Sequence, residues 1–164
     1  MHDEIGAFSH AEGQPLSMDA ARLLTAALRN VLVAVIRGKP TVDTVNSLRG
    51  RAAELAAVHP EGIGLFHVVE LGQGPPPDHA TRTAYVDLLR ERTELRVTAV
   101  IGEAPPFLGA LVRSVATSFM MLARPRYPFR LFGQLDEGKA WFCEATQLCE
   151  GDLRAILDAL RQAR

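Results

Sequence analysis

The stretch IGLFHVVELGQGPPPDHATR, residues 63–82, carries the pattern that decides the fold. Residues 63–71 are apolar almost throughout, which is typical of a strand buried on both faces of a sheet. A loop rich in glycine and proline follows, and Asp78 then stands where a helix N-cap is expected. A buried strand that leads through a short loop into a helix indicates one unit of a parallel α/β sheet.

The same alternation of strands and helices extends on both sides of this unit. Further strands are predicted over 22–28, 31–38, 95–102 and 127–133, and helices over 42–58, 78–93, 107–123, 135–146 and 153–160. The break at Arg29-Asn30 favours a hairpin, because Asn tolerates the positive φ of tight turns. Thr41 is expected to cap the first long helix, His59-Pro60 to end it, and Gly151 to separate the last two helices.

These elements predict a single α/β domain over residues 18–164, preceded by a loose tail over residues 1–17. Its sheet is expected to be mostly parallel but mixed, with about five strands, an N-terminal β-hairpin and four to five helices. The carboxyl ends of the parallel strands are where ligands usually bind in such sheets. Functional residues are therefore expected in the loops that follow the strands.

Composition excludes several classes of function. The chain has 164 residues and a net charge of −1, so no overall basic field is expected to attract nucleic acid or a membrane surface. We expect no membrane span, no secretory signal, and no metal or other cofactor, because the required patterns are missing. Cys143 and Cys149 are too few for a disulfide scaffold, which favours the cytoplasm. Lys39 and Lys139 are the only lysines beside many arginines, which suggests a bacterial coding sequence rich in G and C.

The order of elements resembles the STAS domain (sulfate transporter and anti-sigma-factor antagonist) over residues 22–146, including the GKPT turn (38–41) before the first long helix. The resemblance implies a cytoplasmic, non-enzymatic domain, here with an added C-terminal helix. In the anti-sigma antagonists a phosphorylatable serine lies where the third strand meets the second helix. The corresponding stretch here, GQGPPPDHATR (72–82), contains no serine, so phosphorylation-switched sigma regulation is not expected.

The loop at residues 71–78 is the first candidate site. Gly72 and Gly74 after a strand suggest a phosphate cradle, but three prolines follow, and proline lacks the N–H group that such a cradle requires. We therefore interpret this loop as a strand-to-helix turn. In a STAS-like domain Asp78 would place a fixed negative charge where the family has its phosphoserine. His79 is expected to be solvated, and Arg82 to pair with Asp78 across one helical turn.

Glu70 lies near the carboxyl end of one predicted strand, and Glu103 holds the equivalent place after the next. If those two strands are neighbours, their carboxylates approach each other. Paired carboxylates can raise one pKa and supply a general acid, but we favour the interpretation that each faces water or accepts from an arginine. Arg113, inside the apolar helix 107–123, is one candidate partner. His67 faces the opposite side of its strand and is interpreted as a core residue. Arg124, Arg126 and Arg130 suit the end of that helix and could also contact an acidic partner.

Three functions remain open on the sequence alone. The first is a non-enzymatic STAS-like protein-interaction or regulatory domain, with a possible homodimer through helix 107–123. The second is a small-molecule or lipid-binding module with a pocket beside that helix, in which Phe107 would line the pocket and Arg113 would meet an acidic head group of the ligand. Further residues expected to line that pocket are Phe66, Phe119, Met120 and Met121. The third is an enzyme using Glu70, Glu103 and Arg113, which we rank last.

Overall fold

The fold is described by a computed structural model over residues 22–70, 76–103 and 121–163. One sheet has the strand order β1-β2-β3-β4-β5. Its strands are Arg22–Leu28 (β1), Val31–Arg37 (β2), Ile63–Glu70 (β3), Leu95–Glu103 (β4) and Phe129–Phe132 (β5). β1 is antiparallel to β2, and all other neighbours are parallel. The predicted α/β class, the mixed five-stranded sheet and the N-terminal hairpin are therefore confirmed.

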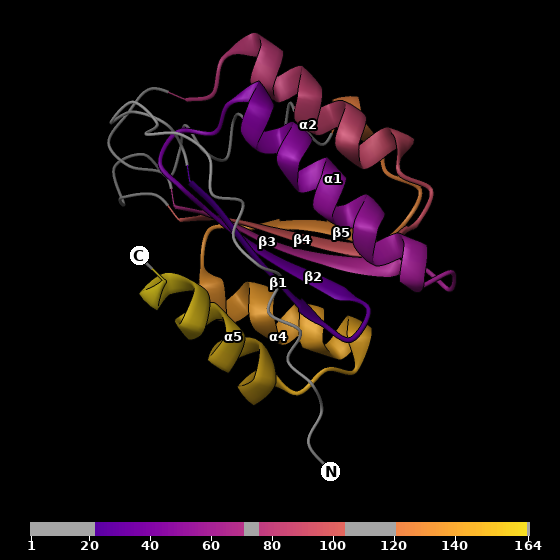
Figure 1. Cartoon of the computed structure of the whole chain (residues 1–164), viewed down its shortest axis with the longest axis vertical. Helices are drawn as coiled ribbons and strands as arrows, with labels where there is room; N and C mark the ends of the chain where they lie inside the picture. Colours follow the sequence, from indigo (N-terminus) through magenta and orange to yellow (C-terminus); the bar gives the residue numbers. More distant parts are fainter. Residues whose placement is uncertain (1–21, 71–75, 104–120, 164) are drawn as a thin grey trace.

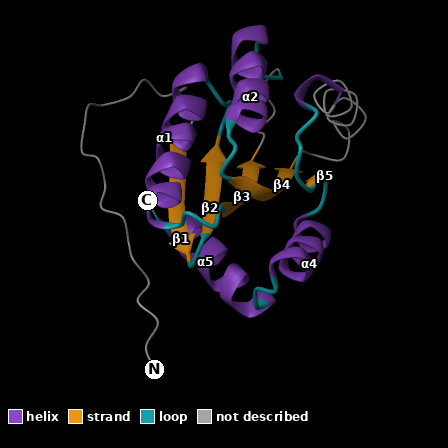
Figure 2. Cartoon of the chain, turned by 90° about the vertical axis from the view of Figure 1, so that its right-hand side faces the viewer, coloured by secondary structure: helices purple, strands orange, loops and turns teal. Residues whose placement is uncertain are grey.

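Helices cover both faces of the sheet. Helices Val42–Val58 (α1) and His79–Glu91 (α2) lie on one face, whereas Leu135–Thr146 (α4) and Glu150–Gln162 (α5) lie on the other (Figures 1 and 2). Alternate residues of each central strand therefore enter two different cores. On β3, Leu65 belongs to the core under α1 and α2, and Phe66 to the core under α4 and α5. Burial on both faces explains why residues 63–69 are apolar almost throughout.

Local capping fixes where the first two helices begin. Thr41 and Thr44 form a capping box, in which the backbone N–H of Thr44 donates to Thr41 Oγ1 at 3.2 Å. At the second helix the backbone N–H of Thr81 donates to Asp78 Oδ1 at 2.8 Å. His59 is the C-cap of α1. All three ends agree with the sequence predictions, because each cap is chosen by residues within one turn.

Two turns differ from the sequence predictions. In the β1–β2 hairpin the positive φ belongs to Arg29, at 53°, and not to Asn30. The amide of Asn30 instead donates to the carbonyl oxygen of Gly62 at 3.1 Å, which ties the hairpin to the start of β3. The break between the last two helices lies at Gln147, with φ of 57°, and Gly151 is inside α5. The hydrogen bond of Asn30 to Gly62 explains the first difference, and the left-handed C-cap at Gln147 explains the second.

Several element ends also moved. β5 is shorter than the predicted strand 127–133, and α5 begins at Glu150 rather than near residue 153. Of the predicted helix 107–123, residues 121–123 are described and helical. The rest of that helix lies outside the described residues, as does the predicted tail over residues 1–17, so neither prediction is tested.

Two glycines provide a matched test of helix packing. A Cβ atom on Gly138 of α4 would lie 2.8 Å from Ile101 Cγ1, whereas nothing lies within 4 Å of a Cβ on Gly50 of α1. We expect Gly138→Ala to lower the free energy of unfolding by about 1 kcal/mol, because overpacking outweighs helix propensity. Gly50→Ala should raise it by about 0.5–1 kcal/mol. Urea unfolding of both variants checks the pair, and equal shifts would contradict the packing of α4 on β4.

Candidate functional site

The carboxyl ends of β2, β3 and β4 bring three charged side chains into one row. Arg37 is paired in register with Glu70, and Glu70 with Glu103. Neighbouring residues of parallel strands at the same level point to the same face of the sheet. The two strands are neighbours, which was the condition for the two carboxylates to meet, and the carboxylates lie on the face that α4 and α5 cover.

Arg161, in the last turn of α5, bridges the two carboxylates. Its Nε donates to Glu70 Oε1 at 3.0 Å, and one terminal nitrogen donates to Glu103 Oε2 at 2.6 Å. Arg37 Nε lies 3.3 Å from the other oxygen of Glu70. We call these four side chains, Arg37, Glu70, Glu103 and Arg161, the rim network. Two positive and two negative charges balance within it.

Arg37 also holds the end of α5. Its guanidinium donates to the carbonyl oxygen of Ala163 at 3.1 Å, and to those of Leu160 and Arg161. The last carbonyl groups of a helix have no partners within the helix and carry its negative dipole end. Arg37 of β2 therefore caps a helix that is distant in sequence, since Arg37 and Ala163 are 126 residues apart.

The four charged side chains of the rim network bind one another. Partial burial alone would lower the pKa of Arg161, but its hydrogen bond to Glu103 and the charges of Glu103 and Glu70 raise that pKa above its usual range. The side chains of all four are about 28–32% exposed. Glu70 and Glu103 both accept hydrogen bonds from the guanidinium group of Arg161, which agrees with the interpretation favoured from sequence.

A second group of predicted residues forms an exposed corner at the N-terminus of α2. We call Lys39, Asp78, His79 and Arg82 the α2 corner. All four are exposed. The hydrogen bonds from Thr81 lower the pKa of Asp78, and the nearby charges of Lys39 and Arg82 lower it further. Asp78 is therefore a fixed negative charge at neutral pH.

One prediction about this corner is wrong. Among the described residues Arg82 forms no ion pair with Asp78; its backbone N–H donates to the carbonyl oxygen of Asp78 at 3.0 Å instead. The carboxylate of Asp78 is already engaged as the helix cap, which turns it toward Thr81. The guanidinium of Arg82 is consequently exposed and open to an external partner.

The two threonines near the corner differ in access. Thr81 is 1% exposed, so its hydroxyl is closed to a modifying enzyme. Thr83 is exposed, and its hydroxyl donates to the carbonyl oxygen of His79 at 3.0 Å. Of these two, Thr83 is the one that a kinase could reach without unfolding the helix.

His67 lies on the opposite side of β3 from Glu70, as the alternation predicted. It is 1% exposed, and its ring stacks on that of Tyr85 of α2 with 5.7 Å between centroids. Its Nε2 has no hydrogen-bond partner among the described residues. Burial lowers the pKa of His67 to about 4, so the ring is neutral in the folded protein. These features indicate a core residue.

The remaining predicted residues are placed as follows. Phe107 and Arg113 lie outside the described residues, as do Phe119 and Met120. Phe66 packs edge-on against Phe142, with ring centroids 5.2 Å apart, on the face opposite to Tyr85. Sequence reasoning missed Arg37 and Arg161; a cation in the last turn of the final helix was the available signal for Arg161.

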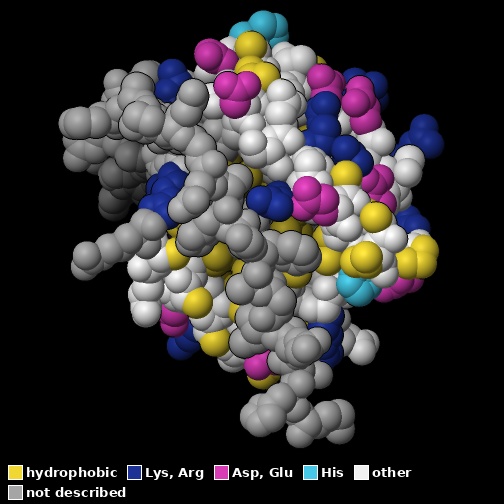
Figure 3. Space-filling view, in the orientation of Figure 1, with side chains coloured by type: hydrophobic (Ala, Val, Ile, Leu, Met, Phe, Trp, Pro, Cys, Tyr) yellow, Lys and Arg dark blue, Asp and Glu magenta, His cyan; other side chains and the backbone are white. Residues whose placement is uncertain are grey.

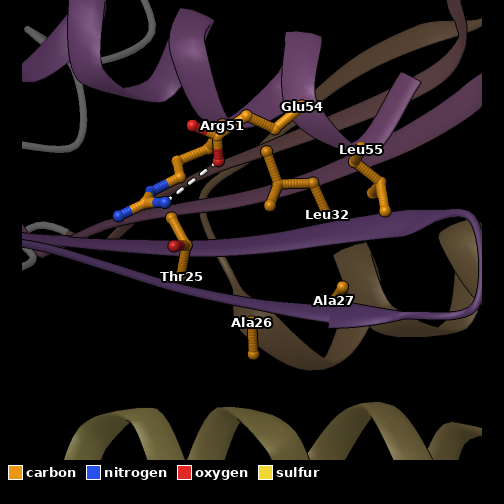
Figure 4. Close-up of a pocket in the computed structure, with 7 residues that line it drawn as sticks. All are labelled: Thr25, Ala26, Ala27, Leu32, Arg51, Glu54 and Leu55. Atoms are coloured by element: carbon orange, nitrogen blue, oxygen red, sulfur yellow. Dashed lines mark hydrogen bonds and ion pairs between the residues drawn. The ribbon is translucent and has the colours of Figure 1, made fainter. Parts of the chain in front are cut away.

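One further opening, between β1 and α1, is too small for a ligand. The gap between β1 and α1 holds about 10 Å³, and the Arg51–Glu54 ion pair lies at its side (Figure 4). That space fits one water molecule at most. Within residues 22–70, 76–103 and 121–163, no cluster of His, Cys, Asp and Glu could hold a metal ion. The helices described there include none that is both long and apolar enough to cross a bilayer.

Comparison with known proteins identifies no relative whose function could be proposed for this chain. No protein-family model, curated protein or solved structure matches the chain. The resemblance to STAS domains therefore stays a prediction, supported by the order of elements alone.

The rim network makes a prediction about coupling. Arg161→Gln should lower the free energy of unfolding by about 1 kcal/mol, since both carboxylates lose a partner that is only partly exposed to solvent. In a double-mutant cycle with Glu103→Gln we expect a coupling energy of about 1 kcal/mol. The control cycle pairs Arg161→Gln with Glu150→Gln at the other end of α5, and its coupling should be near zero. Equal coupling in the two cycles would refute the bridge.

His67 makes a prediction about pH. Because its pKa is lowered to about 4 in the folded state, the unfolded chain binds a proton more readily. The contribution to stability is complete above the unfolded pKa of about 6.5 and is lost as pH falls toward about 4. When the pH falls from about 7 to about 5, the neutral, buried His67 should lower the free energy of unfolding by about 2 kcal/mol. Denaturant titrations of wild type and His67→Phe measure this; the variant should lack that part of the pH dependence, and an unchanged slope would contradict it.

Proposed function

We propose that this chain is a non-enzymatic, STAS-like protein-interaction domain, and that the α2 corner contacts its partner. The observation that carries the proposal is the rim network. Ligands of parallel α/β sheets usually bind beside the carboxyl ends of the strands. Here the charged groups on the α4/α5 side of that rim are bound to each other, which favours a surface role over a catalytic one.

The α2 corner has the features of a contact surface. The cap from Asp78 to Thr81 holds the start of α2 in one conformation, so its charges occupy fixed positions. Lys39 and Arg82 present positive charges near the negative Asp78. His79, the residue after Asp78, is also exposed. A mixed pattern of charge selects partners by complementarity. A fixed Asp78 would make the contact independent of phosphorylation at this position.

The alternatives have weaker support. An enzyme would require Glu70 and Glu103 to be free to react, but both are engaged with arginines. A lipid or other small-molecule pocket beside helix 107–123 stays the second proposal. Of the described side chains expected to line it, Phe66 is in the α4/α5 core and Met121 is exposed. A homodimer through helix 107–123 also stays a prediction.

The corner can be tested by affinity capture with the intact chain. The protein is immobilised and exposed to extracts of cells that carry its gene, and recovered proteins are quantified for wild type, Asp78→Asn and Arg82→Glu. Asn remains a good N-cap, so Asp78→Asn removes charge while keeping the helix start. We expect at least one protein to be recovered about tenfold less with either variant, as for the loss of one good charged contact.

Asp152→Asn is the matched control, because it removes an exposed carboxylate from the first turn of α5 on the other face of the sheet. It should recover the same proteins as wild type. Identical recovery with all variants would refute the α2 corner as a contact surface. Native mass spectrometry of the same preparation serves the second proposal: a bound small molecule in the wild-type protein would favour it over the first.

A further inference from the structure

An open groove lies at the other end of the sheet, beside the start of β4. Its volume is about 910 Å³, and it lies between the C-terminal end of α2 and the segment 121–127. Among the residues that the structure describes, the lining contains no acidic side chain and has five arginines: Arg90, Arg92, Arg96, Arg124 and Arg126. We call this the arginine groove. Sequence reasoning had noticed only the last two of these, since the others come from a different part of the chain.

Other described residues neutralise little of this positive charge. Within residues 22–70, 76–103 and 121–163, Arg92 is the one of the five that forms an ion pair, with Glu94 at 2.6 Å. Arg96 donates to the carbonyl oxygens of Glu61 and Thr93, which carry no net charge. Within the described part of the chain, Arg90, Arg124 and Arg126 form no ion pair and are exposed. The whole chain has a net charge of −1, so this concentration is local.

The face of the molecule that carries α1 has a different arrangement of charge. There, Lys and Arg side chains are interspersed with Asp and Glu (Figure 3). Such mixing is the usual arrangement on a soluble surface. Several cations without counter-charges repel one another, and an anionic partner removes that cost. Arg130, which is close in sequence, lies instead over the ring of Trp141 at 5.3 Å from its centroid.

The arginine groove also exposes apolar surface. Met121 and Leu122 line it and are 68% and 65% exposed. Its base is firmly packed, because Leu95 is 1% exposed and Ala123 is fully buried. The hydroxyl of Tyr127 donates to the carbonyl oxygen of Leu89 at 3.2 Å, which ties the segment 121–127 to α2. A ligand for this surface must therefore combine negative charge with apolar groups.

We propose that the arginine groove binds an acidic segment of a partner protein that also carries apolar side chains. Carboxylates of the segment meet the unpaired arginines, and its apolar side chains cover Met121 and Leu122. Single-stranded nucleic acid fits less well, because it needs aromatic surfaces for base stacking and the one aromatic lining residue, Tyr127, is partly buried. A lipid bilayer fits less well because the apolar residues line a groove instead of a convex surface.

This contact is separate from the one proposed for the α2 corner. The corner lies at the N-terminus of α2, beside the carboxyl ends of the strands, whereas the groove lies at the C-terminal end of α2. The two surfaces can thus be altered independently, and either can fail without affecting the other.

The test begins with a display library of random short peptides selected on the intact wild-type protein. Peptides that also bind Arg124→Glu/Arg126→Glu are removed. We expect the remaining sequences to be enriched in Asp and Glu together with Leu, Phe or Met. The best one is then labelled with a fluorophore, and its Kd is measured by anisotropy. A selection that yields no acidic sequences overturns the proposal.

Three variants separate the two parts of the interaction. Arg124→Glu/Arg126→Glu should weaken the labelled peptide about tenfold or more, whereas Arg29→Glu/Arg154→Glu, with the same change of charge at exposed sites elsewhere, should have little effect. Met121→Ser/Leu122→Ser should weaken it about threefold or more and should not affect a peptide whose apolar residues are replaced by Ser. Equal effects of the two charge variants would overturn the proposal.

Two further probes distinguish other classes of ligand. An oligothymidine and vesicles of phosphatidylserine and phosphatidylcholine are measured against the same variants. The proposal would be overturned if the wild-type protein bound either probe more tightly than the peptide and Arg124→Glu/Arg126→Glu lost that binding. The ligand would then be nucleic acid or membrane. Asp78→Asn should bind the peptide as tightly as the wild-type protein does, because Asp78 belongs to the α2 corner and does not line the groove.

Discussion

The rim network connects the end of the chain to the middle of the sheet. Parallel register places Glu70 beside Glu103 at the ends of β3 and β4, where two carboxylates without partners would repel each other. Arg161 removes that repulsion by binding both, and Arg37 adds a second cation while capping the helix that carries Arg161. The position of α5 and the charge balance of the sheet are thus set by the same four side chains.

This constraint gives the two ends of the sheet different properties. At the carboxyl ends of β2, β3 and β4, the charged side chains of the rim network bind one another, and the α2 corner carries exposed charges. At the start of β4, three of the five arginines of the groove, Arg90, Arg124 and Arg126, form no ion pair with another described residue. Cations without counter-charges favour an external anionic partner, and the proposals place separate contacts at the two ends for this reason.

The elements themselves were largely predictable from the sequence. The buried strand at residues 63–70, the caps at Thr41 and Asp78, and the end of α1 at His59 depend on residues close to each other in the chain. The errors came where a distant contact altered a local preference. Asn30 was assigned the positive φ of its turn, but its side chain bonds to Gly62, and Arg29 takes the left-handed conformation.

The candidate site was predicted only in part. Glu70 and Glu103 were expected to meet because strand ends at one edge of a sheet share a location, and that inference needs only the order of strands. Their partner could not be identified, because Arg161 is 91 residues from Glu70 and 58 from Glu103. The sequence pointed to Arg113 because it lies inside an apolar helix, and nothing local distinguishes an arginine that bridges two strands from one that faces water.

What the sequence by itself determined is the alternation of strands and helices, the burial of the central strands and the charge at the start of α2. These follow from periodicity and capping, which act over a few residues. The tertiary structure alone decided which charges are satisfied. Packing brings Arg161 onto Glu70 and Glu103, and it brings residues 90–96 beside residues 121–127. Electrostatic energy depends on distance in space, so whether an arginine has a partner is known only once the chain is folded.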